Sequence, residues 1–126
     1  MSNTNTHLII SITEDLFFGM KIRTVARNAS IAFEWVSERQ QAVEQFASLL
    51  DQYTDEAILI LLDLSTHIEW RKLHEVSPNS NCLTWVAYAP HVEEEKLKEA
   101  RELGLDQVMP RSKFSRTLEH IISDFN

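Results

Sequence analysis

The sequence is poor in the residues that break or cross-link a chain: it has two glycines, three prolines and one cysteine. The single cysteine, Cys82, excludes an internal disulfide and a cysteine-rich zinc site. The segment TEDLFFG, which follows the first apolar run, has neither GxGxxG nor Walker A spacing. This disfavours nucleotide binding through a glycine-rich loop. No apolar run approaches the roughly 20 residues that span a bilayer.

Positive charge is also scarce. Lys and Arg number 12 against 19 Asp and Glu, which gives a net charge of −7. A nucleic-acid-binding domain needs a basic surface to neutralise phosphates, so the balance argues against nucleic acid as a partner. Residues 1–6 are polar, with no basic region followed by an apolar one. We therefore expect no signal peptide, no membrane association, a disordered start over 1–6 and a cytoplasmic location.

What the chain does have is the composition of one globular domain. It contains 126 residues, 44% of them hydrophobic and 25% charged. Both fractions are typical of soluble globular proteins, and the length fits one domain with a real core. We find no repeat and no low-complexity linker. The sequence therefore predicts a single domain over residues 1–126.

Short apolar runs alternate with amphipathic stretches along the chain, a pattern that predicts alternating strands and helices. The expected strands cover residues 7–12, 31–36, 57–62, 83–88 and 107–109. The expected helices cover residues 15–28, 39–52, 66–76, 93–103 and 115–125. For the third helix, Thr66 and Glu69 have the spacing of a capping box at its start.

Five strand–helix repeats in a short chain predict a parallel sheet covered on both faces. The runs at 57–62 and 83–88 are uninterrupted, as strands buried on both faces are, and with 7–12 they should be central. The strand at 31–36 alternates, with Glu34 facing outward, and should lie at an edge. We therefore predict an α/β, flavodoxin-like three-layer (βα)5 fold with a parallel five-stranded sheet of order 2-1-3-4-5.

Functional groups in such a fold gather beyond the carboxyl ends of the strands. Glu14 and Asp15 follow the first strand, Asp63 follows the third, and Arg111 and Lys113 follow the fifth. Carboxylates brought together can hold Mg²⁺. A carboxylate can also attack a phosphoryl group, and a nearby cation can pair with the charge that forms.

At this point the sequence resembles the receiver domain of bacterial two-component response regulators. The resemblance covers residues 8–125 and rests on the run ILILLDLS, which contains Asp63, on ARELGLDQV at 100–108, and on the basic residues after it. It implies that Asp63 is the phosphoacceptor and that Glu14, with Asp15 adjacent, helps Asp63 to hold Mg²⁺. Either Arg111 or Lys113 would take the role of the family's lysine.

Several positions depart from the family pattern. Counted from Gly104, Ala89 falls where the family has a serine or threonine that responds to phosphorylation, and Val108 falls where an aromatic residue is usual. Arg111-Ser112 stands where the family has Lys-Pro. The acidic pair reads as Thr13-Glu14 or, in a shifted register, as Glu14-Asp15. These departures imply an atypical or pseudo-receiver with a weakened Mg²⁺ site.

The resemblance implies a bacterial signalling role in a phosphorelay. No output domain fits in 126 residues, so we expect a stand-alone receiver. Asp63 would accept a phosphoryl group from a sensor histidine kinase or a phosphotransfer protein, and a downstream protein partner would respond. The alternative is a constitutive pseudo-receiver that binds its partner without phosphorylation, with Asp63 in a structural or electrostatic role.

Two other interpretations are weaker. The string ILLDLS also resembles the core strand of STAS-type anti-sigma-factor antagonists, but the continuation THIEW lacks their serine turn. A helix, moreover, follows the first strand here, where a STAS domain has a second strand. A small hydrolase using Asp63 would need a general acid, and the sequence places none. We therefore expect no enzyme.

Two adjacent aromatic residues stand at the start of the first expected helix. Phe17 and Phe18 cannot both face the core, because neighbouring positions of a helix point in different directions. Phe17 therefore either packs against the preceding loop or forms part of a surface for a partner.

Overall fold

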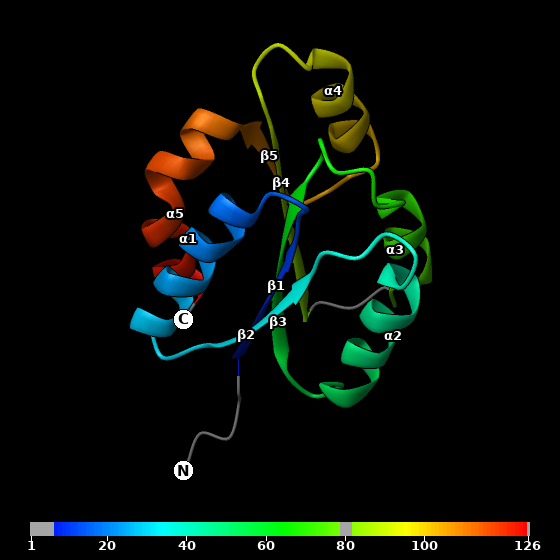
Figure 1. Cartoon of the computed structure of the whole chain (residues 1–126), viewed down its shortest axis with the longest axis vertical. Coiled ribbons are helices and arrows are strands. Elements are labelled where there is room, and N and C mark those ends of the chain that lie inside the picture. Colours follow the sequence, from blue (N-terminus) through cyan, green and yellow to red (C-terminus); the bar gives the residue numbers. More distant parts are fainter. Residues whose placement is uncertain (1–6, 79–81, 126) are drawn as a thin grey trace.

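The computed structural model describes residues 7–78 and 82–125, which form one parallel sheet between two layers of helices (Figure 1). The expectation of disorder over 1–6 lies outside these residues. The strands are β1 (His7–Ile12), β2 (Ala32–Val36), β3 (Ala57–Asp63), β4 (Leu83–Ala89) and β5 (Gln107–Pro110). All neighbouring pairs are parallel and their order is β2-β1-β3-β4-β5. The predicted fold class, strand order and central strands are confirmed.

The helices cover both faces of the sheet. On one face lie α1 (Leu16–Asn28) and α5 (Arg111–Phe125) (Figure 1). On the other lie α2 (Ala42–Gln52), α3 (Trp70–Val76) and α4 (Glu94–Glu102). None of the helices within the described ranges is long and apolar enough to cross a membrane.

The core has two halves, divided by the central strand β3. Ile58, Ile60 and Leu62 join the apolar cluster under α2, α3 and α4. Leu59 and Leu61 join the cluster under α1 and α5. Successive side chains of a strand point to opposite faces, so an uninterrupted apolar run fills both halves. Each such side chain contributes about 1.5–3 kcal/mol when fully buried.

The helix starts differ from the predicted ones by one to four residues, and the third and fifth helices differ most, by four residues each. The third helix starts at Trp70, because the Thr66 hydroxyl donates to Glu14 Oε1 at 3.0 Å and caps no helix. The last helix starts at Arg111, four residues earlier than its apolar pattern indicates. This early start places Arg111 and Lys113 in the first turn of α5.

Gly19 lies inside α1 at a point where the helix meets β2. A Cβ atom at this position would lie 2.1 Å from the Trp35 ring, so only glycine allows the indole to rest on the helix backbone. The Trp35 Nε1–H also donates to the carbonyl oxygen of Thr13 at 3.1 Å. The contact fixes the loop between β1 and α1, which carries Thr13, Glu14 and Asp15.

Candidate functional site

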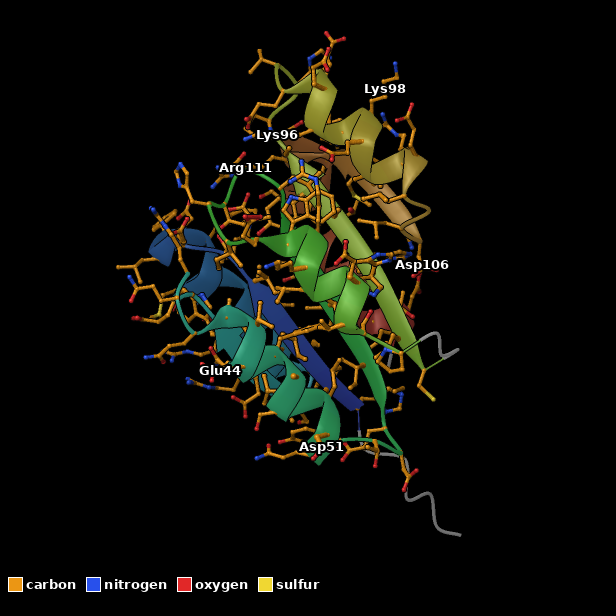
Figure 2. All side chains as sticks on the ribbon, turned by 90° about the vertical axis from the view of Figure 1, so that its right-hand side faces the viewer. Glu44, Asp51, Lys96, Lys98, Asp106 and Arg111 are labelled. Atoms are coloured by element: carbon orange, nitrogen blue, oxygen red, sulfur yellow. The ribbon has the colours of Figure 1, made fainter. Side chains whose placement is uncertain are left out.

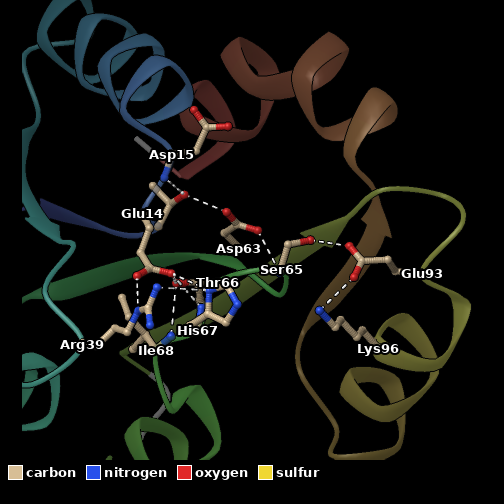
Figure 3. Close-up of polar contacts among 11 residues, drawn as sticks. Glu14, Asp15, Arg39, Asp63, Ser65, Thr66, His67, Ile68, Glu93 and Lys96 are labelled. Carbon is tan, nitrogen blue, oxygen red and sulfur yellow. Dashed lines mark hydrogen bonds and ion pairs between the residues drawn. The ribbon is translucent and has the colours of Figure 1, made fainter.

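Asp63 is the last residue of β3 and its side chain is largely buried, with 7% exposure. Its Oδ2 accepts a hydrogen bond from Thr13 Oγ1 at 2.7 Å, and its Oδ1 accepts one from the Ser65 backbone N–H at 2.9 Å (Figure 3). Burial raises the pKa of Asp63, although both hydrogen bonds and the charge of Arg111 act to lower it. The carboxyl is therefore held by neutral donors in a poorly solvated place.

Thr13 binds Asp63, a role that the sequence did not indicate. It is fully buried, and while its hydroxyl donates to Asp63 it accepts the Asp15 N–H at 3.0 Å. One hydroxyl thus connects the β1–α1 loop to the end of β3. The role of Thr13 could have been inferred from its position, because it directly follows the strand that the predicted order places beside β3.

Asp15 caps α1 and pairs with Arg111. Its Oδ1 accepts the Phe18 N–H at 3.0 Å, and its Oδ2 lies 2.6 Å from Arg111 Nη2. The Phe18 N–H, followed by the Arg111 hydrogen bond, lowers the pKa of Asp15. The guanidinium also lies over the Phe18 ring, 4.5 Å from its centroid.

The two candidate cations, Arg111 and Lys113, lie in different places. Arg111 faces the acidic loop, and its charge acts on both Asp15 and Asp63. Lys113 is exposed and lines a separate hollow between α5 and the sheet, together with residues such as Thr117 and Cys82. Of the two candidate cations, Arg111 is the one that lies beside the loop carrying Asp15.

Glu14 turns away from Asp63. Its carboxylate accepts hydrogen bonds from Arg39 Nε at 2.5 Å, from the His67 backbone N–H at 2.8 Å and from the Thr66 hydroxyl (Figure 3). These contacts, that of Arg39 above all, lower the pKa of Glu14 to about 2. Glu14 therefore joins the loops that follow β1, β2 and β3.

The arrangement does not fit the Mg²⁺ site that the resemblance implies. The carboxylates of Glu14, Asp15 and Asp63 point in different directions (Figure 3). Across the described ranges, no group of three or more His, Cys, Asp or Glu side chains is arranged to hold a metal ion. Mg²⁺ requires converging oxygen ligands in a near-octahedral arrangement, and arginines already neutralise Glu14 and Asp15.

The residue of β4 that pairs with Asp63 lies one position earlier than counting from Gly104 indicates. Tyr88 is the register partner of Asp63, and it shares the core half under α1 and α5. Ala89 belongs to the opposite half. Tyr88 is fully buried and stacks on Phe114. Burial, followed by the charge of Asp63, raises the pKa of Tyr88.

A second polar chain leads from the Asp63 loop to α4. Ser65 donates its backbone N–H to Asp63 and its hydroxyl to Glu93 Oε2, the latter at 2.5 Å. Glu93 also pairs with Lys96 at 2.8 Å (Figure 3). Lys96 and, to a lesser extent, Ser65 lower the pKa of Glu93. Asp63 is thus linked to the first turn of α4 through Ser65.

Comparison with known proteins finds solved structures that share this architecture. No protein-family model and no curated protein sequence matches the chain. Among solved structures, a response regulator receiver protein from Dyadobacter fermentans superposes with a TM-score of 0.70 at 14% identity, covering 95% of this chain and 98% of that one. One from Burkholderia phymatum superposes with a TM-score of 0.65 at 15% identity, covering 94% and 96%.

The fold is that of a receiver domain. Both matches extend over nearly the whole of each chain, so the likeness covers all five strands and helices. At these identities the likeness concerns the fold. Within this receiver fold, Asp63 ends the central strand β3, while Glu14 and Asp15 are engaged by arginines.

Proposed function

We propose that the chain is a receiver-type signalling module that acts by binding a protein partner, and that it does so without Mg²⁺-assisted phosphorylation of Asp63. The observation that carries this proposal is the state of the Asp63 carboxylate. Both of its oxygens already accept hydrogen bonds, and neither Glu14 nor Asp15 is directed toward it. The bacterial, cytoplasmic setting implied by the resemblance belongs to the same proposal.

The chemistry of phosphoryl transfer supports this interpretation. An attacking carboxylate needs an accessible oxygen and a cation that stabilises the charge on the transferring group. Asp63 is 7% exposed, and Thr13 and Ser65 cover its two oxygens. Arg111, the candidate cation whose charge acts on Asp63, is paired with Asp15. Several contacts would have to break before Asp63 could react.

Phosphoryl acceptance by Asp63 is the second candidate, and the position of Arg111 favours it. The guanidinium acts electrostatically on Asp63, and the Arg111 side chain is 37% exposed, so it is open to an incoming anion. In this candidate an Asp63 oxygen attacks the phosphorus of a phosphohistidine on a kinase or phosphotransfer protein. The P–N bond breaks, and the histidine nitrogen keeps the electron pair.

One experiment separates the two candidates. Wild type and Asp63→Asn are incubated with acetyl phosphate, with and without Mg²⁺, and intact mass is measured at short times beside an ordinary receiver as positive control. We expect no mass gain on either protein. A gain of one phosphoryl group on wild type but not on Asp63→Asn would overturn the first proposal and support the second.

A further inference from the structure

A hollow lies between the end of α1 and the start of β2, where the chain turns from the helix into the edge strand (Figure 1). It has a volume of about 430 Å³ and is lined by Arg23, Arg27 and residues 30–33. This volume lies within the range of roughly 300–1,000 Å³ that is usual for small-molecule sites. The hollow is at the amino ends of the strands, whereas Asp63 is at the carboxyl end of β3.

The helix α1 changes in character along its length. Phe17 in its first turn is 85% exposed, so this ring does not pack against the preceding loop. Toward its end the helix carries Arg23 and Arg27, and it contains no acidic residue. Glu44 and Asp51, by contrast, project from α2 in the opposite layer (Figure 2). The hollow is therefore a locally basic place on a chain whose net charge is −7.

The two arginines beside the hollow lack a carboxylate partner. Arg23 and Arg27 are four residues apart, so they are neighbours on one face of α1, where like charges repel each other. Neither forms an ion pair within the described part of the chain, whereas Arg39, Arg71 and Arg111 each pair with a carboxylate. The negative end of the helix dipole favours Arg27 in the last turn, but its effect does not extend to Arg23 one turn earlier. Two such guanidiniums side by side are well suited to bind a dianion.

Ser30 ends α1 in a conformation that is unusual for serine. Its φ is 60°, in the left-handed region where a Cβ atom is strained and where glycine is usual at the end of a helix. The Ser30 N–H donates to the Arg27 carbonyl oxygen and the Ile31 N–H to that of Ala26, both at 3.0 Å, as in a helix end closed by glycine. Serine keeps a hydroxyl beside the hollow in spite of this strain, which indicates a role for the hydroxyl.

Phe33 supplies an aromatic wall of the hollow. It is half-buried on β2 and belongs to the core half under α1, with its ring edge-on to that of Trp35 at 6.4 Å between centroids. Successive side chains of a strand point to opposite faces, so Glu34 lies on the other face of the sheet and does not oppose an anion here. A planar ring system can stack on the accessible part of Phe33.

We propose that this hollow binds a nucleoside monophosphate, with the phosphate between Arg23 and Arg27 and the base against Phe33. A phosphate monoester offers about two negative charges and three acceptor oxygens, which two guanidiniums and the Ser30 hydroxyl can share. A carboxylate offers a single charge and fewer oxygens. A nucleic-acid strand fits less well, because the acidic remainder of the chain would repel its further phosphates.

The inference goes beyond the proposed function and is independent of it. The hollow and Asp63 lie at opposite ends of the strands, so a ligand in the hollow does not touch the Asp63 carboxylate. The site also needs no glycine-rich loop, since its phosphate-binding groups are side chains of α1 and of the turn after it.

NMR titration of the labelled full chain with AMP, GMP, CMP and UMP tests the proposal. Inorganic phosphate and the corresponding nucleosides probe the two halves of the ligand separately. We expect at least one nucleotide to shift the amide signals of residues 23–33 in a saturable way. Inorganic phosphate and the nucleoside should each bind at least about tenfold more weakly than that nucleotide, because each makes only part of the contacts.

Variants of the arginines and of the aromatic wall locate the contacts. Arg23→Gln with Arg27→Gln should weaken nucleotide binding at least about tenfold. The matched control, Lys98→Gln with Arg101→Gln, removes the same charge from α4 in the opposite layer and should leave binding unchanged (Figure 2). Phe33→Leu should weaken binding of the nucleotide but not of inorganic phosphate. Circular dichroism of each variant shows whether a loss of binding reflects loss of the fold.

Ser30→Gly separates a binding role of the serine from a structural one. Glycine adopts a φ of 60° without strain, so the melting temperature should rise. Loss of the hydroxyl should at the same time weaken nucleotide binding about tenfold. A rise in melting temperature with unchanged binding would overturn the role of the hydroxyl.

Three outcomes would overturn the site itself: no amide shift with any of the nucleotides, shifts confined to other elements, or an equal loss in the α4 control. Affinity for inorganic phosphate equal to that for the nucleotides would overturn the base contact and replace the ligand with a simple anion. Affinity that rises with the length of an RNA oligonucleotide would replace the mononucleotide with a nucleic acid.

Discussion

Glu14, which follows β1, and Asp63, which ends the neighbouring strand β3, are two carboxylates with opposite surroundings. Glu14 meets a guanidinium and two further donors, and its pKa falls to about 2. Asp63 meets a hydroxyl and a backbone N–H in a nearly dry place, and its pKa is raised. The difference shows that the partners of an acidic group, more than its place at the end of a strand, determine its charge state.

The two residues therefore serve stability in different ways. Ionised Glu14 holds three loops together, so its charge stabilises the fold. The charge of Asp63 opposes folding, because burial removes water that the neutral donors only partly replace. Substitutions at and beside the two carboxylates test this contrast.

The largest effect is expected for Thr13→Val, which removes the hydroxyl and keeps the shape. The Asp63 carboxylate would lose a donor, and the Asp15 N–H would lose its acceptor. We expect the free energy of unfolding at pH 7 to fall by about 2–3 kcal/mol, because buried polar groups left unpaired are costly. Urea denaturation measures it. Thr13→Ser retains the hydroxyl and should lose much less, and an equal loss in both variants would contradict the role of the hydroxyl.

An intermediate effect is expected for Glu14→Gln, which breaks the ion pair with Arg39. The pKa of Glu14 is lowered on folding, so its contribution is present above its ordinary pKa and is lost as the pH falls toward about 2. Partial exposure screens the pair, and we expect a loss of about 1 kcal/mol at neutral pH. Denaturation of both proteins between neutral and strongly acidic pH should show the curves converging on the acid side. A constant difference would rule out the ionic origin.

The smallest effect, and one of opposite sign, is expected for Asp63→Asn. The pKa of Asp63 is raised on folding, so its stabilising contribution is present in the protonated form and is lost as the pH rises. The neutral amide avoids this loss but gives up one acceptor oxygen, so we expect a gain of about 0.5–1 kcal/mol at neutral pH. Thermal melts at several pH values measure the gain, which should shrink on acidification. Destabilisation at neutral pH would contradict the account.

Much of the fold was predictable because it depends on patterns along the chain. The uninterrupted run 57–62 can be buried only on both faces of a sheet, which made β3 central and placed Asp63 at its end. The start of α5 was predicted four residues too late, because Arg111 and Lys113 are polar and do not extend the apolar spacing of the helix. Hydrophobic spacing shows the buried part of a helix but not its polar first turn.

The candidate site was only partly predictable, because it depends on side-chain direction. Counting from Gly104 placed Ala89 at the position where the family has a serine or threonine, yet the β3–β4 register pairs Asp63 with Tyr88. A shift of one residue moves a side chain to the other face of a sheet. The direction of the Glu14 side chain depends likewise on Arg39, which lies in the loop after β2. Nothing in the sequence pattern indicates that these two residues pair.

The packing of Trp35 against Gly19 has a spectroscopic consequence. Trp70 and Trp85 are buried in the opposite half of the core, whereas Trp35 is half-buried against α1, and its indole N–H is bonded to the carbonyl of Thr13. A protein with Trp70→Phe and Trp85→Phe would therefore fluoresce from the Trp35 indole alone. This indole is connected to Asp63 through Thr13, and it packs against α1, whose first turn carries exposed apolar side chains. The wavelength and intensity of its fluorescence would report changes around Asp63 or on α1 without an added dye.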